Sequence, residues 1–491
     1  MATTVAGTPT LRRVLGFRTV LSTSTGLAYA AISFLGCILV ATTLVGDGAW
    51  LAILIAGILA VLSATCFAEL NALYPSAAAI RLYIKEAFNE RMALTVAFAY
   101  TMTIVAVIAA DSYIVGSAVS FALNLPKLVT LALILVMLAL AAVANLYGIR
   151  IAGLLQDVTT YALLISAVAI SVIGLVNHGL HFHTLLSGID NPGGLFNAVA
   201  AGVFVFSAFE WVTPLSEEVA DIRLIPRGMF LALGILFISY SLFTLACTNL
   251  LSQPDAHGIF HLPANVVTSA YPQMQLAIVA MGDVGKWWML GATLFTGVMT
   301  FNGGFATASR FLYAAAREGT LPNVFAKIND RAVPWVTVVV LASTSAVIAV
   351  LIFLTDQFQA LILVGAALEA MIYAVAGLCV IQLRRRKPTA ERSYRIPGGV
   401  VIPVLVVGIF AVLFVGTLFP PASQLPNVPA AIQMVIVPAI LLSIFGATAI
   451  YVLLVVPRIQ AQLAAQRAAM PRRRPGAPTA STTTTGGSAA E

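Results

Sequence analysis

About a dozen uninterrupted apolar runs of 18 or more residues constrain this 491-residue chain more than any other feature. A helix of about 20 apolar residues spans the hydrocarbon core of a bilayer, whereas a soluble domain has no use for repeated runs of that length. Composition agrees, because 60% of the residues are hydrophobic and only 9% are charged, about a third of the roughly 25% typical of soluble chains. The sequence therefore predicts an all-α protein that crosses a membrane many times.

Breaks rich in charge, proline or glycine divide the apolar runs into twelve expected spans. They lie near residues 20–44, 50–73, 93–121, 128–146, 153–176, 196–218, 228–250, 286–312, 334–354, 358–382, 400–418 and 432–456. An even number of spans places both termini on one side, and this topology puts 24 of the 26 Lys and Arg residues on that side, leaving only Lys127 and Lys286 opposite. Basic residues accumulate on cytoplasmic loops. We therefore expect a multi-pass protein of the cytoplasmic membrane with both termini in the cytoplasm, and we attribute the net charge of +7 to topology, not to nucleic-acid binding.

Two spans contain residues that interrupt a helix. The first carries Ser22-Thr23-Ser24-Thr25-Gly26, and the sixth carries Ser207-Ala208-Phe209-Glu210-Trp211-Val212-Thr213-Pro214. The stretches fall at equivalent positions in two successive groups of five spans, which is the pattern of a transporter built from inverted repeats. The alternative is that small and hydroxyl residues only allow close helix packing.

Several segments resemble the amino acid-polyamine-organocation transporters. The longest match is Ala308-Ser309-Arg310-Phe311-Leu312-Tyr313-Ala314-Ala315-Ala316-Arg317-Glu318-Gly319-Thr320-Leu321-Pro322 after span 8. Shorter matches are Ala68-Glu69-Leu70 to Glu86-Ala87-Phe88, Glu217-Glu218-Val219 to Ile225-Pro226-Arg227, and Tyr394-Arg395-Ile396-Pro397-Gly398. The chain departs from the family in span 5, where some members carry a lysine and this sequence has none between Gly153 and Val176. The coupling mechanism therefore stays open.

The resemblance implies a twelve-helix fold with an inverted five-plus-five repeat and broken helices 1 and 6. It divides the chain into a cytoplasmic N-terminus (1–19), a transport core of spans 1–10 (20–382), a cytoplasmic loop with spans 11 and 12 (383–456), and a largely disordered cytoplasmic tail (457–491). It also implies that Thr25 and Gly26 begin a half-helix whose free N–H groups suit a carboxylate. The substrate amine would then face carbonyl groups near Ser207, beneath an aromatic lid at Phe204.

Three acidic residues lie well inside apolar runs: Asp111, Glu210 and Glu369. Each costs roughly 2.5 to 3.5 kcal/mol at the centre of a membrane helix, so such residues usually mark a pathway or a proton site. We expect Glu210 to carry a coupling proton and Asp111 and Glu369 to meet a cationic substrate group or a second proton. A buried, hydrogen-bonded structural acid is the alternative for each.

Other polar residues carry weaker signals. Asn302, with Gly303 and Gly304, would bring a polar group to the substrate from span 8, although packing explains the glycines equally well. Glu69 is expected to pair with a basic loop residue. All four cysteines lie in apolar runs without metal-ligand spacing. The five histidines fall in two outer loops, where a metal site competes with ordinary solvated side chains: His178, His181, His183, His257 and His261.

The sequence therefore predicts a secondary active transporter of amino acids or related amines, working by alternating access with proton coupling or exchange. It predicts no enzyme activity, cofactor or resident metal, because no nucleotide-binding or nucleophile motif is present. The alternatives are a polyamine or organocation transporter, a transporter-like amine receptor without flux, and a polytopic membrane enzyme.

Overall fold

The computed structural model describes residues 13–42, 48–180, 192–254, 260–267, 269–355, 358–419 and 428–469. In these parts ten helices are long and apolar enough to cross a membrane, and α1 with α2, bent by 48°, makes an eleventh if the pair is one span. The predicted span 286–312 lies within the 46-residue helix α11, which that criterion does not select. The all-α, many-span prediction is confirmed, with ten or eleven spans by this criterion where twelve were expected.

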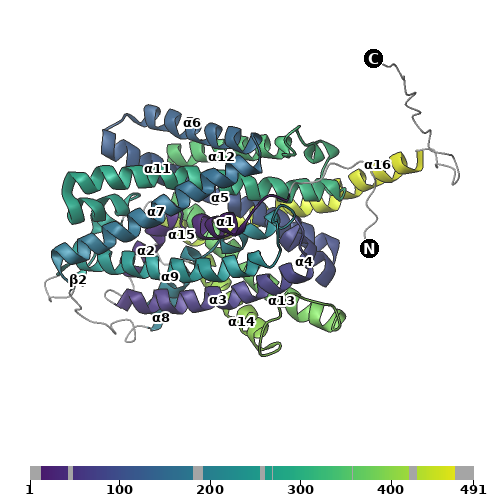
Figure 1. The fold of residues 1–491 in the computed structure, drawn as a ribbon, viewed down its shortest axis with the longest axis horizontal. Helices are drawn as coiled ribbons and strands as arrows, with labels where there is room; N and C mark the ends of the chain where they lie inside the picture. The colour runs from purple at the N-terminus through teal and green to yellow at the C-terminus, as the bar shows by residue number, and fades with distance from the viewer. Residues whose placement is uncertain are drawn as a thin grey trace, which may run out of the picture.

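The helices run side by side along the longest axis of the molecule (Figure 1). Their bounds, in chain order, are α1 Phe17–Ala28, α2 Ala31–Thr42, α3 Ala49–Leu73, α4 Ala79–Ala87, α5 Glu90–Leu123, α6 Lys127–Leu146, α7 Ile149–His178, α8 Pro192–Val205, the 3₁₀ helix η2 Phe209–Leu215, α9 Leu224–Leu251, α10 Ala264–Val267, α11 Pro272–Arg317, the 3₁₀ helix η3 Asn323–Ala326, α12 Trp335–Thr355, α13 Phe358–Arg386, α14 Val401–Leu418, α15 Ala430–Ile450, the π-helical turn η5 Tyr451–Val455 and α16 Val456–Ala469. Two short antiparallel strands, β1 Gln253–Pro254 and β2 Phe260–His261, lie at the end of the bundle opposite α4 and α16.

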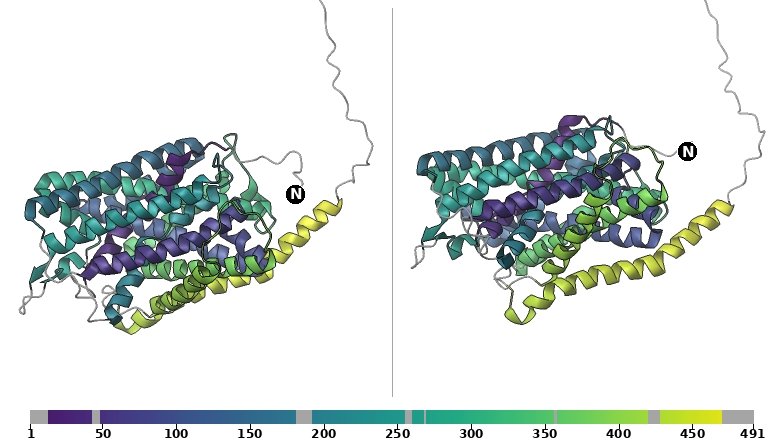
Figure 2. Two further views of the ribbon diagram at one scale, coloured as in Figure 1. Left: turned by 60° about the horizontal axis from the view of Figure 1, so that its bottom comes forward. Right: turned by 90° about the horizontal axis from the view of Figure 1, so that it is seen from below.

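Burial separates central helices from peripheral ones. The apolar window of α13 is 83% buried and that of α5 78%, whereas α14 reaches 28% and the continuous segment Ala431–Gln462 only 22%. Figure 2 shows α15 and α16 along the outside of the bundle. The last two apolar helices are therefore peripheral. Helix α16 extends to Ala469, so the first part of the predicted tail is helical; residues 470–491 lie outside the described residues.

Small residues allow the central helices to approach closely. A Cβ atom at Gly303 would come within 2.6 Å of Leu27 on α1, and one at Gly304 within 2.6 Å of Ile108 on α5. Helix α11 can therefore lie against both α1 and α5, which is how membrane helices gain van der Waals contact without a hydrophobic driving force. The packing interpretation of these two glycines is supported by the structure.

Candidate functional site

The first membrane helix is interrupted at Tyr29 and Ala30, between α1 and α2. Its freed backbone groups find partners within the protein. The Ile32 amide donates to Asp111 Oδ1 at 2.9 Å, and the Ala28 carbonyl accepts from Ser33 Oγ at 2.6 Å and from the Tyr240 hydroxyl. Non-helical backbone at membrane depth is tolerated only when it is satisfied in this way or lines a cavity.

The break lies later in the chain than the sequence predicted. Ser22 to Gly26 are helical and belong to α1, so Thr25 and Gly26 do not begin the half-helix; α2 begins at Ala31. The Ser22 hydroxyl bonds back to the Thr19 carbonyl, which is compatible with a continuous helix. Gly26 instead allows close packing, because a Cβ there would lie 2.2 Å from Thr160 Oγ1. The hydroxyls of Ser24 and Thr25 are buried and have no hydrogen-bond partner in the described parts of the chain.

The second interruption falls where the sequence placed it. Helix α8 ends at Val205, Ala208 has a left-handed φ of 74°, and the chain continues as η2 with Pro214 inside it. Ser207 lies within this break, and its hydroxyl donates to the Val203 carbonyl at 3.3 Å. The chain therefore has two helix interruptions, in α1–α2 and in α8–η2.

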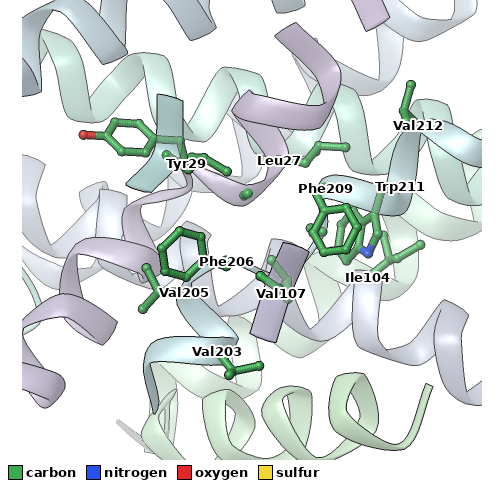
Figure 3. Close-up of a cluster of buried hydrophobic side chains, with 14 of the residues drawn as sticks. Leu27, Tyr29, Ile104, Val107, Val203, Val205, Phe206, Phe209, Trp211 and Val212 are labelled. Carbon is green, nitrogen blue, oxygen red and sulfur yellow. The ribbon is translucent and has the colours of Figure 1, made fainter. Parts of the chain in front are cut away.

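The two breaks meet through aromatic side chains. The ring of Tyr240 on α9 stacks on Tyr29 at 5.2 Å and meets the edge of Phe206 at 5.3 Å. Figure 3 shows the surrounding apolar cluster, with side chains from both breaks and from α5: Leu27, Tyr29, Phe206, Phe209, Ile104 and Val107. Although they are far apart in the sequence, the interruptions form one region inside the bundle.

Two of the three predicted acids lie in one hydrogen-bond network. Glu210 is fully buried and accepts from the Tyr100 hydroxyl at 3.3 Å and from the Tyr373 hydroxyl at 2.9 Å. The next residue, Trp211, donates its indole N–H to Glu369 Oε1 at 3.3 Å. Helices α5 and α13 and the η2 segment thus share one buried network with two carboxyl groups. Glu369 Oε2 has no hydrogen-bond partner in the described parts.

Asp111 lies apart from that network. It follows Tyr100 on α5 by eleven residues, which places their backbones about 16 Å apart along the helix. Its contact is with the beginning of α2. Phe204 packs in the same apolar cluster as Ala31 and Ile32. The structure therefore groups Asp111 and Phe204 with the first break, and Glu210 with Glu369.

The space beside Phe204 is small. Side chains of α2, α8, α13 and α14 enclose a cavity of about 30 Å³ there, lined by Gly36, Asn197, Phe204, Ile362, Ala366 and Thr417 among others. A cavity of this size holds about one water molecule. That volume is too small for an amino acid.

Asn302 makes hydrogen bonds to residues of two neighbouring helices. Its amide donates to the Ala152 carbonyl at 2.8 Å and to Gln156 Oε1 at 3.3 Å, and its Oδ1 accepts from Asn145 at 3.0 Å. These bonds tie α6, α7 and α11 together. They support the packing role that the sequence left open for this region.

Several residues of the site were not singled out from the sequence. Asp157 on α7 is buried and accepts hydrogen bonds from Ser22 and Thr19 of α1, at 3.4 Å from the latter. Because Asp157 is an acidic residue within the fifth expected span, the sequence alone could have identified it as a candidate. Tyr373 follows Glu369 by one helical turn, whereas nothing in the sequence connects Tyr100 to Glu210.

The segments that resemble the transporter family are joined by ion pairs at one end of the bundle. Arg310 Nε lies 3.0 Å from Glu218 Oε2 with both side chains buried, and Arg317 lies 2.9 Å from Glu217. Glu69 accepts from Arg384, from Arg392 at 2.6 Å and from the Ile396 amide at 2.8 Å. The expected pairing of Glu69 with a basic loop residue is confirmed. We call this end, which also contains α4, the basic end.

Metal-ligating side chains do not cluster in the described parts of the chain, where no group of three or more His, Cys, Asp or Glu residues could hold an ion. His181, His183 and His257 lie outside the described residues. His178 Nδ1 lies 3.2 Å from the Gly174 carbonyl oxygen of its own helix. All four cysteines are free and buried, as small core residues are: Cys37, Cys66, Cys247 and Cys379.

Comparison with known sequences gives one family. A family model described as "Amino acid permease" matches residues 15–445. The chain is 27% identical over 217 residues to a branched-chain amino acid permease of Bacillus subtilis, a match covering 44% of each chain. It is 24% identical over 385 residues to the human large neutral amino acids transporter small subunit 2, covering 74% of this chain and 68% of that one. A vacuolar cationic amino acid transporter of Arabidopsis thaliana is 27% identical over 376 residues, with 68% and 57% covered.

Comparison with solved structures supports the fold. A manganese transporter of Eremococcus coleocola, in a mutant form, superposes with a TM-score of 0.60 at 13% identity. The match covers 93% of this chain and 99% of the transporter. At that identity the likeness concerns the arrangement of the helices alone.

Proposed function

The chain belongs to the amino acid permease family, and on that premise we propose that it moves amino acids or related amines across the cytoplasmic membrane by alternating access. The observation that carries the proposal is the meeting of two interrupted helices, α1–α2 and α8–η2, inside the bundle. Secondary transporters hold their substrates near mid-membrane, where two interrupted helices meet. The small cavity beside Phe204 fits a closed state between two open ones.

The proposed topology counts α1–α2 as one span and includes α11, which gives twelve spans. Spans 1 to 10 form two inverted repeats of five, and α14 and α15 follow as peripheral spans. The basic end, rich in Arg and Lys, faces the cytoplasm together with both termini. The excess of basic residues on one side of the expected topology supports this orientation.

Glu210 is the proposed coupling residue, with Glu369 as its neighbour in the network. Their two carboxyl groups flank Trp211 in the interior, where a second unpaired negative charge costs several kcal/mol. A proton that enters with the substrate relieves this cost, and the hydroxyls of Tyr100 and Tyr373 hold the Glu210 carboxyl in place. Proton-coupled uptake or exchange follows from such a site.

Uptake of labelled amino acids and polyamines into proteoliposomes tests the proposal, with and without an inward pH gradient. We expect uptake by the unaltered protein to rise with the gradient, and Glu210→Gln to remove that stimulation, because glutamine cannot exchange a proton. Glu391→Gln makes the same chemical change at an exposed position and serves as the control. Stimulation by the gradient that persists in Glu210→Gln would refute the coupling assignment, and absence of flux for every amino acid and amine would refute the transport proposal.

A further inference from the structure

The beginning of α2 already holds a carboxylate. Asp111 Oδ1 accepts from the Ile32 amide, in the first turn of a 12-residue helix that starts at the break in the first span. The positive end of a half-helix with unpaired N–H groups is a site for an anion. In this chain the anion comes from α5, 79 residues along the sequence.

The carbonyl side of the same break is also occupied. Ser33 and Tyr240 both donate to the Ala28 carbonyl, and the Tyr29 amide donates to the carbonyls of Thr25 and Gly26. A ligand that enters here meets a break whose backbone is largely satisfied. Recognition must therefore rely on side-chain atoms that remain without partners.

Besides the Ser24 and Thr25 hydroxyls of α1, two such atoms lie beside the beginning of α2. Thr300 of α11 is next to the Asp111 carboxyl, and both side chains are fully buried. Apart from each other, Asp111 Oδ2 and Thr300 Oγ1 have no hydrogen-bond partner within the described parts of the chain. The Thr300 hydroxyl can donate to the carboxylate, and the lone pairs that remain on both oxygens can accept from a ligand that donates hydrogen bonds.

We propose that Asp111 takes the place of a substrate carboxylate at α2, and that the ligand binds through a cationic amine held by Asp111 Oδ2 and Thr300 Oγ1. The substrate class is then an organic amine that needs no carboxylate of its own. A ligand carboxylate at α2 would meet Asp111, and like charges in a dry interior repel strongly. Phe204 belongs to the apolar cluster that surrounds the start of α2.

The inference rests on the transport site of the proposed function, but its test measures binding alone. Three matched probes are L-leucine, 3-methylbutylamine, which is leucine without its carboxylate, and 4-methylpentanoate, which is leucine without its amine. Affinities are measured on the full-length protein in detergent. We expect the amine to bind at least as well as leucine, and the acid not to bind.

Asp111→Asn tests the residue itself. The amide keeps an oxygen for the Ile32 N–H but removes the charge, so the affinity for 3-methylbutylamine should fall about 10- to 100-fold. Asp283→Asn, the same change at an exposed position on α11, is the control and should leave it unaltered. Thr300→Ala removes one contact and should cost a smaller factor, which keeps the test available if Asp111→Asn does not fold.

Three outcomes overturn the inference: no binding of the amine to the unaltered protein, binding of 4-methylpentanoate in preference to it, or unchanged amine affinity in both variants. Failure of the transport proposal gives a different result. Amine binding that depends on Asp111, without flux in vesicles, would refute transport and leave this inference standing.

Discussion

Replacing Glu218 by glutamine should destabilise the protein, because the side chain forms a fully buried ion pair at the basic end. The Glu218 and Arg310 side chains are 1% and 0% exposed, and their atoms meet at 3.0 and 3.4 Å. Removing one partner of a buried pair leaves the other charge unpaired, at a cost of about 3 to 5 kcal/mol. The neutral amide oxygen of glutamine still accepts one hydrogen bond from the charged guanidinium, worth about 1.5 to 3 kcal/mol, so the expected loss is about 1 to 3 kcal/mol.

The adjacent residue supplies the control. Glu217 pairs with Arg317 at 2.9 Å, but these side chains are 22% and 35% exposed. Water screens such a pair, and Glu217→Gln should cost about 0 to 1 kcal/mol. The two variants make the same chemical change one residue apart, so the comparison isolates burial.

Chemical unfolding in mixed micelles, followed by intrinsic fluorescence, measures both variants against the unaltered protein. A double variant, Glu218→Leu with Arg310→Leu, should lose less stability than Glu218→Gln, because no buried charge remains unpaired. Equal unfolding midpoints for Glu218→Gln and Glu217→Gln would refute the argument from burial.

Two further changes test local geometry and charge. Gly26→Val should cost about 1 to 3 kcal/mol or more, because its Cβ would lie 2.2 Å from Thr160 Oγ1. Gly234→Val, at an exposed position inside α9 where a Cβ meets open space, is the control and should leave the thermal midpoint nearly unchanged. The hydrogen bond from Lys387 holds the pKa of Glu86 below its ordinary value. The contact therefore stabilises the fold at pH values above the ordinary carboxyl pKa, and this stabilisation is lost as the pH falls through the lowered pKa of Glu86. Glu86→Gln should reduce the change in thermal midpoint between pH 6 and pH 3. An unchanged pH profile of the thermal midpoint would contradict this.

The two helix breaks show how well local sequence predicts where a membrane helix is interrupted. The prediction for the sixth span was accurate, because it contains Pro214, which disfavours a regular helix. The prediction for the first span placed the break too early, because Ser, Thr and Gly are compatible both with a break and with a helix that packs closely. In the structure, Gly26 lies close to Thr160 and Gln156, so its role is to allow close helix packing.

The sequence also identified the buried acids but not their partners. Their place inside apolar runs was visible at once, since each charged residue in such a run is costly. Their partners were not visible, because Glu210 meets Tyr373 across 163 residues, Trp211 meets Glu369 across 158, and Asp111 meets Ile32 across 79.

By itself, then, the sequence determined that the chain is a bundle of membrane helices, with an excess of basic residues at one end and a few acids in its interior. Solvation by lipid imposes these properties on any chain of this kind, and they can be read residue by residue. Only the tertiary structure decided which helices are neighbours. A membrane helix is apolar on every side, so its hydropathy pattern does not reveal which face packs against protein. The pairing of Glu210 with Glu369, and the capping of α2 by Asp111, follow from that packing alone.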